Sequence, residues 1–212
     1  MPLKVQNLCF KYNGEKNLIN ELTFSLGKGE KFLIVGENGV GKSTLLKLIV
    51  DELKPLSGII EKGSKTDIAY YAQEHELLDN NKTIIENFNH LNIEEKKLRS
   101  FLGRFLFYGD DVFKKVKVLS PGERSRVALA LISLSGSNFL VLDEPTNHLD
   151  LETQEIIAST FKDYKGTMLI VSHNPSFIDF LGIDRILILP TGEICYYDKK
   201  ILEYYNKINT KE

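Results

Sequence analysis

A glycine-rich loop between a strand pattern and a helix pattern constrains this chain more than any other feature. Residues 36–44 read Gly-Glu-Asn-Gly-Val-Gly-Lys-Ser-Thr and fit G-x-x-x-x-G-K-[ST] at every position. The compact apolar run Lys31–Val35 precedes the loop, and Thr44–Val50 has the composition of a helix. Such glycines let backbone N–H groups turn inward, and the helix directs its positive end at bound phosphate. The loop therefore predicts an α/β P-loop nucleoside triphosphatase fold.

The side chains of this loop have separate expected tasks. Lys42 is expected to reach the β- and γ-phosphates of ATP, and the Ser43 hydroxyl to bind Mg²⁺. An ordinary glycine turn before a helix is the alternative, but the strand before the loop and the helix after it disfavour that alternative. The expected nucleotide-binding residues of the loop are Gly36, Glu37, Asn38, Gly39, Val40, Gly41, Lys42, Ser43 and Thr44.

An acidic pair closes a second apolar strand pattern. Asn138–Leu142 is a continuous apolar run, as expected for a parallel strand buried on both faces, and Asp143 and Glu144 follow it. Ligands of open α/β sheets bind at the carboxyl ends of strands. We predict that Asp143 holds Mg²⁺ opposite Ser43 and that Glu144 accepts a proton from the attacking water. A helix cap or a solvated turn is the alternative for such a pair.

The short element Leu119–Glu123 lies between these two motifs and has two compatible interpretations. Ser120 and Glu123 form a capping box with Pro121 at the first helical position. The same helix start can bind a γ-phosphate through the Ser120 hydroxyl and the Gly122 N–H group. We therefore include Ser120, Gly122 and Glu123 among the predicted nucleotide-binding residues.

Taken together, these motifs resemble those of ATP-binding-cassette (ABC) ATPases, and the resemblance covers nearly the whole chain. Leu119–Glu123 is similar to the signature that binds nucleotide held by a different cassette, and Asn147–Asp150 to the D-loop. Tyr12 resembles the aromatic residue that stacks on adenine. Gln73 resembles the glutamine that senses Mg²⁺ and water, which makes it a catalytic and metal-site candidate, and His173 resembles the catalytic switch histidine. The resemblance implies hydrolysis of ATP to ADP and phosphate.

Within these ATPases the chain looks most like the ABC-F subfamily. The stretches Glu144–Asp150 and Ser120–Arg124 carry this resemblance, and Tyr204 and Tyr205 resemble the aromatic tail of ABC-F domains. The resemblance implies that two cassettes clamp two nucleotides. The partner cassette is either an identical chain or a missing half of the same protein. It further implies a ribosome-associated translation factor or antibiotic-resistance protein.

Two departures and two alternatives accompany this resemblance. Pro121 stands where the family usually has glycine, and the segment between residues 77 and 118 is short, which suits the second cassette of an ABC-F protein. The first alternative is the nucleotide-binding subunit of a transporter with separate membrane permease subunits. The second is a non-hydrolysing binding module, which the presence of Lys42, Asp143, Glu144 and His173 disfavours.

The order of strand and helix patterns predicts the architecture. We expect a mostly parallel sheet flanked by helices, an antiparallel subsheet from residues 3–10 and 22–26, and a small helical lobe. The chain is expected to form one ABC domain over residues 1–212. Its core lobe would comprise 1–76 and 119–212, and its helical lobe about 77–118, with helices at 83–89 and 94–105.

Composition limits the remaining classes. The formal net charge of −2 excludes a global basic field, although a local basic face is compatible with it. The apolar runs are too short to span a membrane, and residues 1–5 do not form a signal peptide, so the chain itself is not expected to be transmembrane. Cys9 and Cys195 show no metal-binding spacing, and we expect two buried thiols in a reducing cytoplasm.

Overall fold

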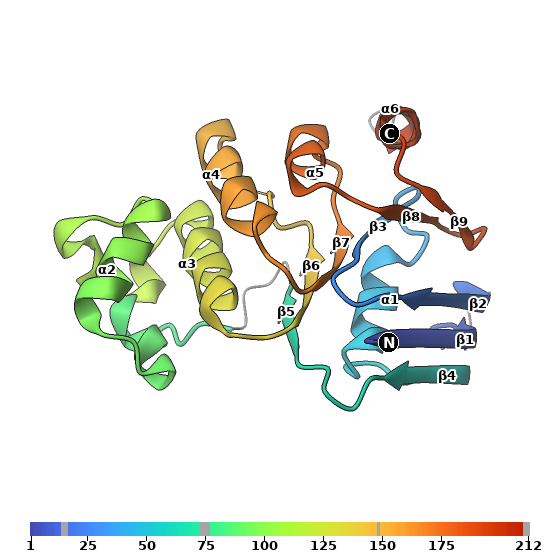
Figure 1. Cartoon of the computed structure of the whole chain (residues 1–212), viewed down its shortest axis with the longest axis horizontal. Coiled ribbons are helices and arrows are strands. Elements are labelled where there is room, and N and C mark those ends of the chain that lie inside the picture. The colour runs from blue at the N-terminus through green and yellow to red at the C-terminus, as the bar shows by residue number, and fades with distance from the viewer. Residues whose placement is uncertain (14–16, 73–76, 148, 210–212) are drawn as a thin grey trace.

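The computed structural model describes residues 1–13, 17–72, 77–147 and 149–209. A six-stranded sheet with the order β5-β6-β7-β3-β8-β9 forms its centre (Figure 1). Its first five strands are parallel, and β9 pairs antiparallel with β8. The strands are β5 (Ile68–Tyr71), β6 (Phe139–Asp143), β7 (Thr167–Val171), β3 (Lys31–Val35), β8 (Arg185–Ile188) and β9 (Glu193–Tyr196). The predicted fold class is confirmed.

Alternate residues of the central strands enter two different cores. In β3, Leu33 and Val35 belong to one buried cluster, whereas Phe32 and Ile34 belong to the other. This burial on both faces explains why the central strands are continuous apolar runs. The α-helices that contribute to the first cluster are α2 (Glu95–Arg104), α3 (Pro121–Leu134), α4 (Leu151–Lys162), α5 (Pro175–Leu181) and α6 (Lys199–Asn209), and α1 (Lys42–Ile49) belongs to the second.

The predicted antiparallel subsheet packs with α1 on the second core. It has the order β2-β1-β4, with β1 at Leu3–Phe10, β2 at Ile19–Leu26 and β4 at Ser57–Lys62. The β2 strand begins three residues before its predicted start. Because Ile19 and Leu22 are both buried in this core, apolar packing extends the strand toward the turn.

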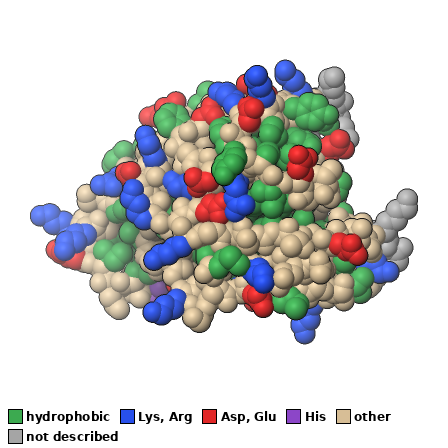
Figure 2. Space-filling view, turned by 45° about the vertical axis from the view of Figure 1, so that its right-hand side comes forward, with side chains coloured by type: hydrophobic (Ala, Val, Ile, Leu, Met, Phe, Trp, Pro, Cys, Tyr) green, Lys and Arg blue, Asp and Glu red, His purple; other side chains and the backbone are tan. Residues whose placement is uncertain are grey.

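The helical elements between β5 and α3 lie at one end of the molecule, beyond α3 (Figure 1). They comprise the α-helix α2 (Glu95–Arg104) and the 3₁₀ helices η1 (Ile85–Leu91), η2 (Gly109–Phe113) and η3 (Val116–Val118). The helix predicted at 83–89 is a 3₁₀ helix and lies two residues later, at Ile85–Leu91. Figure 2 shows Lys and Arg side chains gathered over this end, so a local basic face exists.

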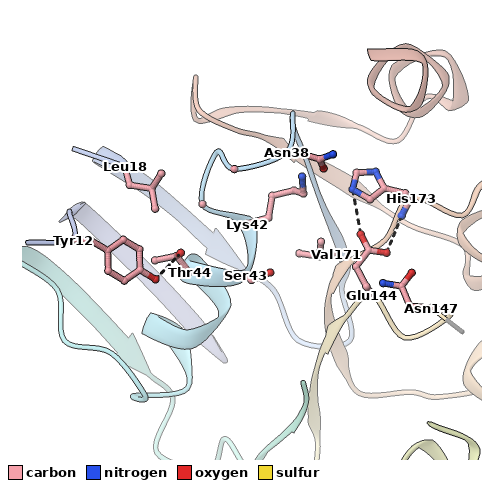
Figure 3. A pocket seen from close by; sticks show the side chains of 12 residues that line it. Tyr12, Leu18, Asn38, Lys42, Ser43, Thr44, Glu144, Asn147, Val171 and His173 are labelled. Carbon is pink, nitrogen blue, oxygen red and sulfur yellow. Dashed lines mark hydrogen bonds and ion pairs between the residues drawn. The ribbon is translucent and has the colours of Figure 1, made fainter. Parts of the chain in front are cut away.

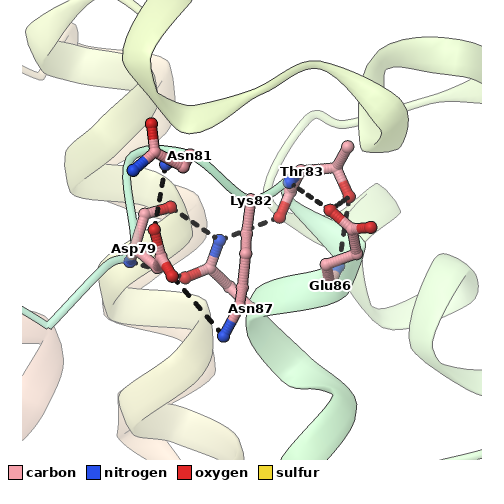
Figure 4. A network of polar contacts seen from close by, with 6 residues as sticks. All are labelled: Asp79, Asn81, Lys82, Thr83, Glu86 and Asn87. Carbon is pink, nitrogen blue, oxygen red and sulfur yellow. Dashed lines mark hydrogen bonds and ion pairs between the residues drawn. The ribbon is translucent and has the colours of Figure 1, made fainter.

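A polar network holds the start of this helical region (Figure 4). The buried Asn87 side chain accepts from the Asp79 N–H group at 2.8 Å and donates to the Thr83 carbonyl at 2.8 Å. Thr83 and Glu86 form the predicted capping box, with Glu86 Oε2 accepting from the Thr83 N–H group at 2.7 Å and the Glu86 N–H group donating to Thr83 Oγ1 at 3.3 Å. In this network, side chains form the hydrogen bonds of backbone N–H and carbonyl groups that would pair with other backbone groups in a continuous α-helix.

Three further expectations have different outcomes. The C-terminal helix α6 was not predicted, although its Leu202 is buried against the first core. Cys9 and Cys195 are free thiols but only partly buried, so the prediction of two fully buried thiols was wrong. Within the described ranges, no helix is both long and apolar enough to cross a bilayer.

Candidate active site

The backbone of the P-loop is shaped by glycines that other residues could not replace. A Cβ atom at Gly36 would lie 2.6 Å from the Leu189 carbonyl oxygen. Gly41 has a φ of 97° and is the N-cap residue of α1, so the chain turns through the left-handed region as the helix begins. Because glycine has no side chain to cap the helix, the first N–H groups of α1 can serve a bound anion.

Lys42 is held inside this loop. Its side chain is only 8% exposed, and Nζ donates to the carbonyl oxygens of Gly36 at 2.9 Å and Glu37 at 2.8 Å. Burial lowers the pKa of Lys42, whereas the nearby carboxylates of Glu144 and Asp143 raise it. The ammonium group is therefore fixed in position within the loop, facing two acidic residues from β6 and the segment after it.

Asp143 and Ser43 form the oxygen pair that the sequence predicts for a cation. Asp143 ends β6 and is 4% exposed. Burial raises the pKa of Asp143, and a hydrogen bond from the Ser43 side chain lowers it. Carboxylate and hydroxyl oxygens suit Mg²⁺. No group of three or more His, Cys, Asp or Glu residues suited to a metal occurs in the part of the chain that the structure describes.

Glu144 lies beside His173 with its side chain 14% exposed, and it adopts an unusual backbone conformation. Its φ is 47°, in the left-handed region that few residues other than glycine occupy. The His173 N–H group donates to Glu144 Oε2 at 3.3 Å, and His173 Nε2 lies 3.2 Å from Oε1. This second contact is within ion-pair distance but lacks hydrogen-bond geometry, since Oε1 has no hydrogen-bond partner among the described residues. Burial raises the pKa of Glu144 to about 7.

One cavity of about 480 Å³ collects most of the predicted residues (Figure 3). Lys42 points into its centre, with Tyr12 at one end and Glu144 and His173 at the other. The predicted site residues that line it are Tyr12, Asn38, Gly39, Gly41, Lys42, Ser43, Thr44, Glu144 and His173, and Asn147 joins them from the stretch that resembles the D-loop. Sequence reasoning missed two further lining residues, Leu18 and Val171. Neither was predicted as a site residue, because Leu18, just before β2, and Val171, at the end of β7, reach the cavity through the packing of these strands.

Tyr12 stands at the open end of this cavity. Its ring is 43% exposed and meets Phe10 edge-on at 5.0 Å, and its hydroxyl group lies 3.3 Å from Thr44 Oγ1. An exposed ring next to Leu18 offers an apolar face for a planar group. Gln73 and His148, both marked by the sequence, lie outside the described residues, so the structure does not place them.

The predicted signature residues line a second pocket, not the first. This pocket is bordered by Ser120, Pro121, Gly122, Glu123, Arg126, Leu149, Asp150 and Thr153. The Glu123 N–H group donates to Ser120 Oγ at 3.2 Å, and Glu123 Oε2 accepts from the Ser120 N–H group at 2.9 Å. The predicted capping box with Pro121 at the helix start is therefore confirmed. Within one chain, these residues do not reach the P-loop pocket.

Comparison with known proteins agrees with this geometry. The family model described as ABC transporter matches residues 19–147. The chain belongs to this family. A solved structure, the dimeric post-hydrolysis state of the ATP-binding cassette MJ0796 bound to ADP and Pi, superposes with a TM-score of 0.75 at 23% identity. The match covers 92% of this chain and 98% of the other, and confirms the cassette fold.

Curated relatives extend the similarity beyond the matched core. The putative ATP-binding protein YdiF of Bacillus subtilis is 42% identical over 99% of this chain and 34% of its own length. The ATP-binding protein Uup of Escherichia coli is 38% identical over 83% of this chain and 28% of its own length. The energy-dependent translational throttle protein EttA of Escherichia coli is 36% identical over 95% of this chain and 37% of its own length. The predicted resemblance to ABC-F proteins, to which Uup and EttA belong, is confirmed. The chain spans about a third of the length of these relatives.

The raised pKa of Glu144 predicts a pH dependence of stability. Its folded-state pKa of about 7 exceeds its ordinary value of 4.5, so the folded state holds a proton that the unfolded chain releases. This stabilisation is complete below pH 4.5 and is lost as the pH rises through 7. Without nucleotide, the wild type should lose about 2–3 kcal/mol more unfolding free energy than Glu144→Gln between pH 5 and pH 8. Urea unfolding at both pH values measures this difference, and equal losses in the two proteins would show that Glu144 is ionised throughout.

Proposed function

We propose that this chain hydrolyses ATP to ADP and phosphate. One observation carries the proposal: Lys42 of the P-loop and Glu144 occupy the same cavity from opposite sides. Lys42 and the first N–H groups of α1 would bind the β- and γ-phosphates. Tyr12 and Leu18, at the open end, would contact the adenine ring. The cassette relatives, which are named as ATP-binding proteins, support this nucleotide.

Glu144 is the general base of the proposed reaction. Water attacks the γ-phosphorus, the bond to the bridging oxygen of ADP breaks, and Glu144 takes a proton from the water. A pKa of about 7 suits this role, because the carboxylate is a stronger base than an exposed one and is still ionised in part at neutral pH. The contacts of His173 with both carboxylate oxygens would orient Glu144 toward the water.

Mg²⁺ is the proposed cofactor. Ser43 and Asp143 would hold it, with Gln73 as a further candidate from the sequence. When bound, Mg²⁺ neutralises charge on the phosphate oxygens. The hydrogen bond between Ser43 and the buried Asp143 supports the assignment, because it brings a hydroxyl and a carboxylate oxygen together beside Lys42.

The second pocket supports the proposal that two cassettes act together. Ser120, Gly122 and Glu123 would contact the γ-phosphate held by the P-loop of a partner, since they lie in a pocket apart from their own P-loop. The dimeric state of the cassette MJ0796 supports this arrangement. The partner would be an identical chain or, because the relatives are about three times as long, a second cassette of the same polypeptide.

The division into two lobes that the sequence predicts is part of the proposal. We propose one cassette domain with its core lobe at 1–76 and 119–212 and its helical lobe at about 77–118. Parallel pairing of β5 with β6 supports this division, since the chain leaves and re-enters the same sheet edge around the inserted segment. Pro121 is compatible with the function, because a first-position helix N–H group has no partner within the helix.

Replacing Glu144 tests the enzymatic proposal. Glu144→Gln keeps the shape of the side chain and removes its basicity, so ATP turnover should fall by about 10² to 10⁴-fold while ATP binding persists. Phosphate release and nucleotide binding with Mg²⁺ measure the two quantities in the same preparation. Glu155→Gln, the same substitution at an exposed residue of α4, is the matched control and should turn over ATP as the wild type does. Undiminished turnover in Glu144→Gln would remove Glu144 from the mechanism.

We further propose that the cassette acts on the ribosome, in the cytoplasm, as an ABC-F translation factor or resistance protein. The similarity to a translational throttle protein and the basic face over the helical end support this role. Exposed Lys114, Lys115 and Lys117 lie in that region. The alternative remains a transporter subunit whose partner is a membrane permease.

Ribosome binding separates these two roles. Because Glu144→Gln should retain ATP, this variant should co-sediment with ribosomes when ATP and Mg²⁺ are present and dissociate when ADP replaces ATP. Sucrose-gradient sedimentation of the full-length protein measures the association. Failure to co-sediment in the ATP state, combined with retention on membranes that contain a permease, would contradict the ribosomal role.

A further inference from the structure

One loop connects the two pockets of the cassette. It begins at Glu144 in the P-loop pocket and ends at Leu149 and Asp150 in the signature pocket. Its first residue is attached to the central sheet, because the Glu144 N–H group donates to the Val171 carbonyl at 2.8 Å. Its last residue caps α4, with Asp150 Oδ1 accepting from the Thr153 N–H group at 2.9 Å. Leu149 in the signature pocket is thus only five residues along the chain from Glu144, the proposed base in the P-loop pocket.

The Gln154 side chain, on the second turn of α4, joins this loop to the segment that carries His173. Its Nε2 donates to the Leu149 carbonyl at 2.9 Å and, at 3.5 Å, to the Thr146 carbonyl. Its Oε1 accepts from Asn174 Nδ2 at 2.5 Å. A glutamine can do both because its amide has a donor and an acceptor group. Leucine at this position would offer neither, and glutamate would place a second acceptor against the Leu149 carbonyl.

Asn174 transmits this contact because its own orientation is fixed. Its Oδ1 accepts from the Phe177 N–H group at 3.0 Å and caps α5, and its N–H group donates to Ser172 Oγ at 3.2 Å. The preceding residue, His173, contacts both oxygens of Glu144. Three hydrogen bonds therefore connect Leu149 to Gln154, Gln154 to Asn174 and His173 to Glu144, and the backbone supplies the links between them.

We propose that Gln154 is a positioning residue that couples occupation of the signature pocket to the placement of Glu144 and His173. The inference rests on the proposed ATPase function and adds a residue that lines neither the P-loop pocket nor the signature pocket. When a partner's nucleotide contacts the signature pocket, Leu149 is held in place. Because Gln154 contacts both the Leu149 carbonyl and Asn174, it then also restrains the backbone after His173, and with it the contacts of His173 with Glu144.

Three substitutions test this coupling: two remove one hydrogen bond each, and the third removes both. Gln154→Glu keeps the acceptor for Asn174 and loses the donor to Leu149. Asn174→Asp keeps the α5 cap and loses the donor to Gln154. Gln154→Leu removes both contacts. Each should lower kcat by about tenfold or more, because small misplacements of catalytic groups are costly. The dissociation constant for ATP should stay within about twofold of wild type, because Lys42 and the P-loop are untouched. Glu155→Gln is the matched control.

Hydrogen exchange without nucleotide supplies a readout independent of turnover. Gln154→Leu should raise amide exchange in both 145–150 and 172–177, whereas Glu155→Gln should raise neither. Exchange that rises in only one segment or in none, or kcat values within twofold of the control, would overturn the coupling. A wild-type chain and partner that hydrolyse no ATP would instead refute the proposed function, while the exchange result would still decide whether Gln154 joins the two segments.

Discussion

Backbone N–H groups at two helix starts determine how this cassette can bind phosphate. At α1, Gly41 leaves the first N–H groups available and the glycine loop curves around them. At α3, the side chains of Ser120 and Glu123 each accept a hydrogen bond from a backbone N–H group of the helix start, and Pro121 is the first helical residue. The same electrostatic property, the positive end of a helix, is thus presented in two pockets. The pockets are separate within one chain, and in the proposed function a complete site would combine one helix start from each of two cassettes.

The central sheet brings the acidic groups to the first of these helix starts. The β6 strand is buried along its whole length, so the residues that end it are carried into a region of low polarity. Asp143 remains paired with Ser43, whereas Glu144 is turned by its positive φ toward His173. The surroundings of the two neighbouring carboxyl groups therefore differ, which is consistent with the separate roles proposed for them, one toward a cation and the other toward a proton.

The sequence predicted the fold and most of the site because both depend on local chemistry. Strand β3 and the capping box at Ser120 follow directly from apolar runs and from cap residues. Leu18 and Val171 escaped prediction, since only the tertiary packing of their strands brings them to the cavity. Helix α6 was missed because its Leu202 is buried by contact with a core built from distant elements. The role of Gln154 likewise depends on contacts between three segments that no local pattern reveals.

The trans role of the α3 helix start is the central claim, and a matched pair of cap substitutions tests it most directly. Ser120→Ala and Thr83→Ala each remove a capping-box hydroxyl and should each cost about 1 kcal/mol of stability. Only Ser120→Ala should lower ATP turnover, by about 10²-fold, because it alone removes a donor to the developing phosphate charge. Both variants should bind ATP as monomers with wild-type affinity. Equal turnover in the two variants, or lost monomer binding in Ser120→Ala, would contradict the claim.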